Sequence, residues 1–344
     1  MAKLPKRSQE IRRFILENLR QHPTDILKVA SERFRVSRQA ISGHLKRLVD
    51  EGSLVGQGTR RTRRYSLRVL VERDFSYNLR GLAEDIVWRR DIAPLLADLR
   101  PNVKAIWQFG VTEMLNNAID HSGGTVAIVR VKRTAVDTAV DVVDDGEGIF
   151  AKIQREMGLE DEQHAILELH KGKLTTDPVN HTGEGIFFAS RMFDQFFIVS
   201  GETIFVHDSS KDEGFVEGFV RMPGGTIVSM WLKNETNKTT KAVFDAFTDD
   251  DFGFTTTVVP VHLARYGEEA LVSRSQAKRL LARFDKFRKV MLDFKGVKEI
   301  GRAFADEIFR VFAQAHPEVM LMTEHTNPDI DQMINQARRG LSQD

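Results

Sequence analysis

Glu113 and Asn117 are the pair of residues best suited to chemistry in this chain. They lie between Lys104 and Ile119, where apolar residues recur with a helical period. Because the two are four residues apart, a helix places their carboxylate and amide oxygens on one face. Mg²⁺ prefers oxygen ligands and is usually shared with substrate phosphates. The pair therefore indicates a magnesium site, although a surface Glu and a solvated Asn fit the spacing equally well.

Asp144 ends an alternating run, residues 139–144, that predicts a strand. Gly146 and Gly148 follow it, and glycines allow a backbone to turn sharply and approach a ligand closely. A buried carboxylate is costly without a donor, and the exocyclic amine of adenine is one such donor. By itself the segment also fits a tight Asp-Gly turn that closes a hairpin.

A third segment, residues 181–185, precedes an apolar run from Ile186 to Phe193 that is typical of a helix. Gly183 and Gly185 allow its backbone to approach a ligand. Free N–H groups at a helix start bind phosphate well, so this segment suits a phosphate-binding turn.

In this order, the three segments resemble the nucleotide site of the gyrase, chaperone, histidine-kinase and MutL (GHKL) ATPase superfamily. The resemblance implies the Bergerat α/β-sandwich fold with bound ATP and Mg²⁺. It implies that Asn117 contacts Mg²⁺, that Glu113 shares this site and activates the attacking water, and that Asp144 binds the adenine amine. It further implies nucleotide contacts by Gly146, Gly148, Thr182, Gly183 and Gly185.

The chain departs from that family at His181 and Glu184, where Gly and an aliphatic residue are usual. These departures put the detailed phosphate contacts in question. The family often has a Gly-Thr pair near the adenine, and Thr226 matches it in a predicted turn before a strand.

The charged segment from 150 to 180 corresponds to the mobile lid of the family. The resemblance implies that Lys171 and Lys173 reach the phosphates from this lid. Each lysine also fits a solvated charge run.

The net charge of +1 hides an uneven distribution along the chain. Residues 1–70 hold 17 Lys and Arg against 6 Asp and Glu, a net charge of +11, so the remainder carries −10. Only the N-terminal segment has the charge expected of a polyanion-binding domain.

Helices are predicted in this segment over residues 8–21, 26–34 and 38–51, with Ser37 as a cap of the third. Short strands at 54–55 and 65–67 follow, separated by a basic loop. The arrangement resembles a winged helix-turn-helix, whose third helix enters the major groove of double-stranded DNA.

The resemblance makes the polar face of the third helix and the basic loop candidate DNA contacts. The helix residues are Arg38, Gln39, Ser42, His44 and Lys46, and the loop residues, suited to phosphates or the minor groove, are Arg60, Arg61, Arg63 and Arg64. A helical domain with a solvated basic surface, or a winged helix that binds protein, remains an alternative.

Strands and helices alternate beyond residue 255, which implies a sheet covered by helices. Strands are predicted at 255–264, 290–294 and 319–322, and helices at 273–287 and 301–315. The segment from Leu292 to Asp306 resembles the STAS-like fold of anti-sigma-factor antagonists, of the DUF4325 type. Such domains are phosphorylated on a Ser at the start of a helix, but this chain has Gly301-Arg302-Ala303 there. A docking role or a scaffold role remains open for this domain.

The fold class that follows is multidomain α+β: a winged helix over 1–70, a histidine-kinase-like ATP-binding domain over 71–235 and a STAS-like domain over 255–344. The absence of cysteine, of a long apolar run and of a signal peptide predicts a soluble cytoplasmic protein without disulfides or a membrane partner. A homodimer is expected by analogy with regulators that read paired half-sites.

Three functions fit these features. The first is a transcriptional regulator in which Mg-ATP modulates the winged helix. The second is a serine or histidine protein kinase of an anti-sigma partner-switching system, although no phospho-acceptor His precedes the ATPase segment. The third is a slow ATPase clamp, for which Glu113 supplies a catalytic base but no transducer domain is recognisable.

Overall fold

The computed structural model describes residues 5–59, 62–174, 183–209, 214–251, 253–265 and 269–339, with the backbone alone over 214–223. The chain divides into two compact units. One comprises Met1–Phe75 together with Arg130–Val140 and Trp231–Thr236, and the other comprises the remaining residues. Helices and sheets occur together throughout, so the protein is of the α+β class.

The N-terminal segment forms three helices followed by a two-stranded sheet. These elements are α1 (Lys6–Asn18), α2 (Ile26–Phe34), α3 (Arg38–Asp50), β1 (Leu54–Gln57) and β2 (Arg64–Leu67). Ser37 caps α3 by accepting a hydrogen bond from the backbone N–H of Ala40 at 3.2 Å. The core is aliphatic, with Ile15, Ile41 and Leu45 completely buried. β1 and β2 pair antiparallel, with Leu54 opposite Leu67.

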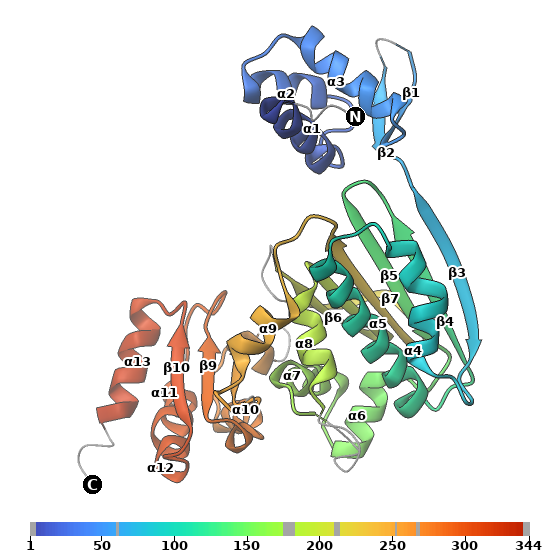
Figure 1. Ribbon diagram of the computed structural model, residues 1–344. Coiled ribbons are helices and arrows are strands. Elements are labelled where there is room, and N and C mark those ends of the chain that lie inside the picture. The colour runs from blue at the N-terminus through green and yellow to red at the C-terminus, as the bar shows by residue number, and fades with distance from the viewer. Residues whose placement is uncertain are drawn as a thin grey trace. The chain divides into compact units, whose positions relative to one another are not determined.

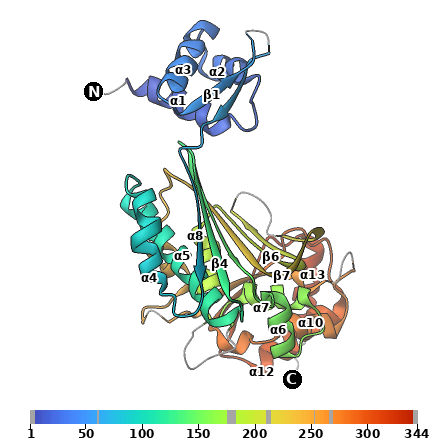
Figure 2. The same ribbon diagram turned by 90° about the vertical axis from the view of Figure 1, so that its right-hand side faces the viewer.

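A five-stranded sheet forms the middle of the chain. Its order is β3 (Val71–Asn78), β4 (Val126–Arg133), β5 (Asp137–Asp144), β7 (Gly214–Lys233) and β6 (Gln195–Asp208). Two helices, α4 (Glu84–Val87) and α5 (Pro101–His121), lie on one face of this sheet (Figures 1 and 2). Short helical turns η1 (Trp88–Ile92) and η2 (Ala93–Leu96) join them. Helix α8 (Gly185–Met192) packs against α5, and the Trp107 and Phe193 rings are 4.8 Å apart.

Two of the described segments differ from their predicted form. The charged segment beyond residue 150 forms two helices, α6 (Ile149–Met157) and α7 (Glu162–Lys171), and residues 165–171 of α7 are buried. Thr226 does not follow a turn between strands, because Gly224 and Gly225 lie within β7 itself. Gly225 has φ +81°, so the strand is locally distorted beside Asp144.

The C-terminal part has a three-stranded parallel sheet of order β10-β9-β8. Its strands are β8 (Thr256–Pro260), β9 (Lys289–Asp293) and β10 (Met320–Glu324). The helical elements are α9 (Thr240–Phe247), η3 (Val261–Ala264), α10 (Arg274–Leu281), η4 (Phe284–Lys286), α11 (Arg302–Asp306), η5 (Glu307–Phe312), α12 (Ala313–Ala315) and α13 (Pro328–Arg339).

Two predicted boundaries in this part are wrong. The strand expected over 255–264 ends at Pro260, and a 3₁₀ turn replaces its last residues. The helix expected over 273–287 ends at Leu281, because Ala282 is extended and Arg283 has φ 64°. Apolar spacing alone does not reveal this break, because Phe284 and Phe287 remain buried beyond it.

Candidate functional site

A pocket in the middle of the chain brings together residues from four distant segments. The sequence-predicted residues in its wall are Glu113, Asn117, Asp144, Gly148, Gly183, Gly185 and Thr226. They come from α5, the end of β5, the start of α8 and β7. Gly146 lies beside this wall rather than in it, and Thr182 is outside the described residues.

The first wall of the pocket is the contact between α5 and the start of α8. Gly185 is the first residue of α8, and a Cβ at this position would overlap the Glu113 carboxylate oxygen Oε2. Only glycine allows this approach, because any side chain would displace the carboxylate. Asn117 lies one turn further along α5, and its Nδ2 is 3.9 Å from the Met114 sulfur. The two oxygen-bearing side chains therefore share one pocket with the backbone that opens α8.

Asp144 forms a second wall at the end of β5. Its Oδ1 accepts a hydrogen bond from the Gly146 N–H at 2.9 Å. Burial raises the pKa of this carboxyl, and hydrogen bonds from the backbone of Gly146 and Thr226 oppose the shift. A carboxylate that is partly removed from water at the pocket wall is suited to accept a further hydrogen-bond donor.

The adjacent Asp145 has a different environment and a different role. It accepts hydrogen bonds from the Val126 N–H at 2.8 Å and from the N–H and the hydroxyl of Thr125 at 2.6 and 2.7 Å. These hydrogen bonds lower the pKa of Asp145 to about 2. Asp145 thus joins the strand end to the loop before β4, and Asp144 alone faces the pocket.

Thr226 ties β7 to the helix that follows Asp144. It is buried, and its hydroxyl oxygen accepts a hydrogen bond from the Ile149 N–H at 3.1 Å. Gly148 has φ +93°, and a Cβ there would overlap the Ser200 hydroxyl. A Cβ at Gly225 would likewise overlap the Asp144 carbonyl oxygen. The glycines are therefore needed for three segments to meet at the pocket.

Lys152 is a pocket residue that sequence reasoning missed. It lines the wall from α6, and its Nζ donates to the His121 carbonyl oxygen at 2.8 Å. The carboxylates of Glu147 and Glu156 each lie 3.8 Å from that ammonium. The sequence signal that could have identified Lys152 is its position four residues after Gly148, in the helix α6 that begins directly after that glycine.

The two lysines expected at the phosphates do not line this pocket. Lys171 is completely buried. Its Nζ donates to the Glu168 carboxylate, to the carbonyl oxygen of Arg279 in α10 and to that of Ala282, the residue directly after α10. Lys173 donates to the Lys286 carbonyl oxygen at 2.8 Å and lies 4.9 Å from the centre of the Phe287 ring. Neither lysine belongs to the pocket wall, because each is held by the C-terminal part of the chain.

The candidate DNA-binding residues of α3 fall into two groups. Arg38, Gln39, Ser42 and Lys46 are exposed on one side of the helix. His44 is half-buried on another side, and its Nδ1 has no hydrogen-bond partner. Burial lowers the pKa of His44, and the charges of Arg12 and Arg47 lower it further. His44 therefore belongs to the packing of α3 and not to its exposed face.

The basic loop between β1 and β2 is described only in part. Arg63 and Arg64 are exposed, and the Arg63 guanidinium lies 5.6 Å from the centre of the Tyr65 ring. Arg60 and Arg61 are outside the described residues. Gly58 has φ +87° in the turn, where a Cβ would lie 2.6 Å from the Thr62 carbonyl oxygen.

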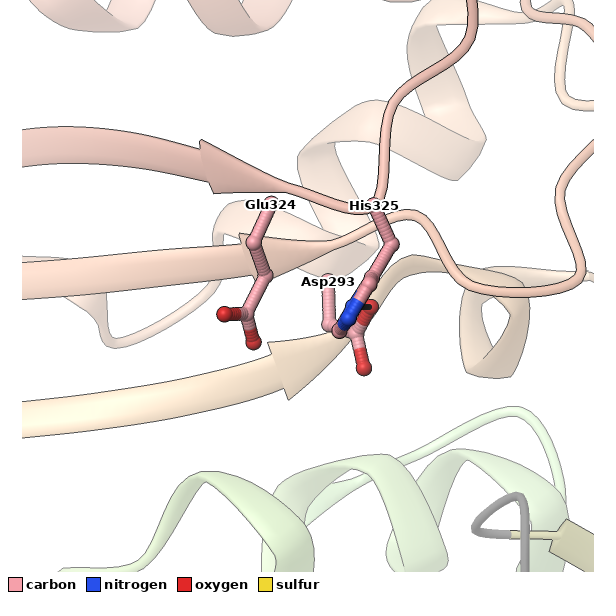
Figure 3. Close-up of side chains that lie close together, drawn as sticks. All are labelled: Asp293, Glu324 and His325. Atoms are coloured by element: carbon pink, nitrogen blue, oxygen red, sulfur yellow. Dashed lines mark hydrogen bonds and ion pairs between the residues drawn. The ribbon is translucent and has the colours of Figure 1, made fainter.

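A second cluster of polar side chains lies at the carboxyl ends of β9 and β10 (Figure 3). One side-chain atom from each of Asp293, Glu324 and His325 lies within 4.8 Å of the other two. The Asp293 oxygen Oδ1 accepts from the Lys295 N–H at 2.9 Å and is 2.8 Å from His325 Nδ1. The hydrogen bond between Asp293 and His325 joins the ends of β9 and β10, which explains why these side chains lie together. We assign no ion to the cluster.

Residues 276–331 match the family model described as a STAS-like domain of unknown function (DUF4325). This match supports a STAS-like domain over residues 276–331 of the C-terminal part. No curated protein matches the chain at a significant level. Within the described residues, no helix is both long enough and apolar enough to cross a bilayer.

Proposed function

We propose that this protein is a DNA-binding transcriptional regulator that responds to Mg-ATP. The observation that carries the proposal is the convergence on one pocket of Glu113, Asn117, Asp144, Gly185 and Thr226, which together span more than a hundred residues of the sequence. The three segments that resemble the GHKL nucleotide site are those that meet there. The close approach of Gly185 to Glu113 lets the backbone at the start of α8, where free N–H groups suit phosphate, lie directly beside the candidate magnesium ligand.

In this proposal ATP and Mg²⁺ are the ligands of the pocket. Asn117 and Glu113 would hold the magnesium ion, and Asp144 would accept the adenine amine. Magnesium would neutralise phosphate charge. The proposal includes slow hydrolysis of ATP, in which Glu113 would orient the attacking water.

Nucleotide binding is tested by isothermal titration of ATP and ADP, with Mg²⁺, into the full chain. We expect binding by the wild type and loss of detectable binding by Asn117→Ala, because the variant removes a magnesium ligand. Gln108→Ala is the matched control, since Gln108 is exposed on the same helix and lies outside the pocket wall. A wild-type protein that is folded but binds no nucleotide would rule out the ATP-dependent part of the proposal.

The N-terminal segment supplies the DNA-binding part of the proposal. Its α3 has an exposed polar face, and β1, β2 and the loop between them form a basic hairpin, as in a winged helix-turn-helix. The charge of +11 on residues 1–70 favours a polyanion as the partner over a neutral protein surface. A homodimer would allow two such segments to read paired half-sites.

Removal of Arg63 and Arg64 together tests the basic hairpin. We expect weaker binding to double-stranded DNA and a decrease of roughly 2 in the slope of log K against log salt, because two phosphate contacts are lost. Electrophoretic or anisotropy titrations over a series of salt concentrations measure both quantities. The control removes two exposed cations outside this segment, Lys241 and Lys289, and we expect it to change neither.

Phosphorylation of the STAS-like domain at the start of α11 is not favoured. The residue that caps α11 is Gly301, followed by Arg302 and Ala303, and none of these has a hydroxyl group. The STAS-like domain is therefore proposed to dock or to sense, with a protein partner as one possible ligand.

A further inference from the structure

Three charged side chains, Glu168, Lys171 and Arg283, form a buried network that the nucleotide pocket does not use. We call this network the latch. The Lys171 and Glu168 side chains are 0% and 1% exposed, and the Arg283 side chain is 13% exposed. Burial of three charges is costly unless each is paired and hydrogen-bonded, so this network needs a specific account.

The latch joins α7 to the STAS-like domain by direct hydrogen bonds. Lys171 Nζ donates to Glu168 Oε1 at 2.6 Å and to the carbonyl oxygens of Arg279 and Ala282 at 3.1 and 2.9 Å. The Arg283 guanidinium donates to Glu168 Oε2 and to the Gly172 carbonyl oxygen, each at 2.6 Å. One carboxylate thus binds two cations, one from each side of the contact.

The local backbone of the STAS-like domain is shaped to make these contacts. The last carbonyl groups of a helix have no partner within the helix, and the Lys171 ammonium binds one of them at the end of α10. A cation is also favourable at a helix C-terminus. The left-handed conformation of Arg283 then turns the chain directly after α10. The break in the predicted helix is therefore the feature that places Arg283 at Glu168.

The far side of α7 belongs to the nucleotide pocket. Leu169, between the two latch residues of α7, lines the pocket wall, as does Leu174. The Leu174 N–H donates to the Gly183 carbonyl oxygen at 3.1 Å, so the residues after the latch are bonded to the predicted phosphate turn. A shift of α7 would therefore move two residues of the pocket wall.

We propose that the STAS-like domain controls nucleotide exchange at the pocket by holding α7 through the latch. This inference rests on the proposed function, because it concerns the regulation of the same site. Any ligand or protein that displaces the end of α10 would release Lys171 and Arg283 from Glu168. The pocket wall would then loosen and the nucleotide would dissociate faster.

Arg283→Gln in the full chain tests the latch. The change removes the guanidinium and leaves a shorter, neutral polar side chain, so both contacts of the Arg283 terminal nitrogens are lost. We expect a fluorescent ATP analogue to dissociate about tenfold faster in stopped-flow measurements, a typical coupling between two sites. Hydrogen exchange over residues 162–174 should also increase without nucleotide. Arg288→Gln is the control, because Arg288 is 76% exposed and pairs with Asp249 across 3.3 Å.

The outcomes separate this inference from the proposed function. No binding of the analogue by the folded wild type would overturn both. If the wild type binds the analogue and the variant releases it at the same rate, the latch alone is overturned. The same holds if hydrogen exchange in α7 becomes faster in the variant but dissociation of the analogue does not. If Arg283→Gln fails to fold, Arg283→Lys is used. It keeps a cation but loses the two-sided contact, so we expect an intermediate rate.

Discussion

Glu168→Gln is expected to lower the free energy of unfolding by about 3–5 kcal/mol at pH 7. The change leaves the Lys171 ammonium buried without its carboxylate, while Arg283 also loses its charged partner. An uncompensated buried charge costs more than the pair itself contributes. The glutamine is close in shape to the glutamate, so the effect reports the charge and not a cavity. Denaturant unfolding monitored by circular dichroism measures the change.

The pH dependence of this loss provides a second check. Burial lowers the pKa of Lys171 to about 8, and the charge of Glu168 opposes that shift. The folded pKa lies below the unfolded value of 10.5, so the unfolded state binds more protons between pH 8 and 10.5. Stability contributed by this group therefore rises with pH in that window. Glu168 raises the pKa of folded Lys171, so the variant loses the Lys171 proton at a lower pH than the wild type. The difference in stability between wild type and Glu168→Gln should therefore shrink as the pH rises toward 8, and stay constant above it.

An exposed pair of the same type is the control for Glu168→Gln. Lys241 and Asp245 are 2.6 Å apart, one helical turn from each other, and their side chains are 79% and 50% exposed. We expect Asp245→Asn to cost less than about 0.5 kcal/mol, as is usual for such surface pairs. An equal loss of stability in the two variants would contradict the assignment of the latch as a specific buried network.

Asp144→Asn is expected to weaken ATP binding by about tenfold to a hundredfold, the cost of removing a charge-assisted hydrogen bond at a desolvated site. The amide keeps the shape of the side chain but loses the charge that favours the adenine amine. The wild type should also prefer ATP to GTP, because guanine presents a carbonyl oxygen where adenine presents the amine. The variant should reduce this preference. Titration of both nucleotides into both proteins measures the effect.

Asp141→Asn is the matched control for the pocket. Asp141 precedes Asp144 by three residues on β5, and it lies outside the pocket wall. We expect it to leave nucleotide affinity unchanged. If Asp144→Asn bound ATP as tightly as the wild type while remaining folded, Asp144 would have no role in base recognition, and the adenine would have to bind elsewhere in the pocket.

Sequence alone determined the features that depend on local spacing. The four-residue separation of Glu113 and Asn117 places both on one face of the helix, one turn apart, and the structure brings both to one pocket. Alternation predicted a strand ending at Asp144, and β5 ends there. Helical periodicity and the Ser37 cap located α2 and α3 with their observed starts. In each case the physical cause lies within a few residues, so a single segment contains the information.

Tertiary structure decided where the charged side chains of the middle region go. The resemblance to the GHKL lid implied that Lys171 reaches the phosphates, yet its partners at Arg279 and Ala282 are more than a hundred residues away. The end of α10 at Leu281 also depends on that contact, since Arg283 leaves the helix and binds Glu168. A buried charge requires partners from whichever segment packs against it. No local pattern encodes that choice, and only the folded arrangement of α7 and the STAS-like domain supplies it.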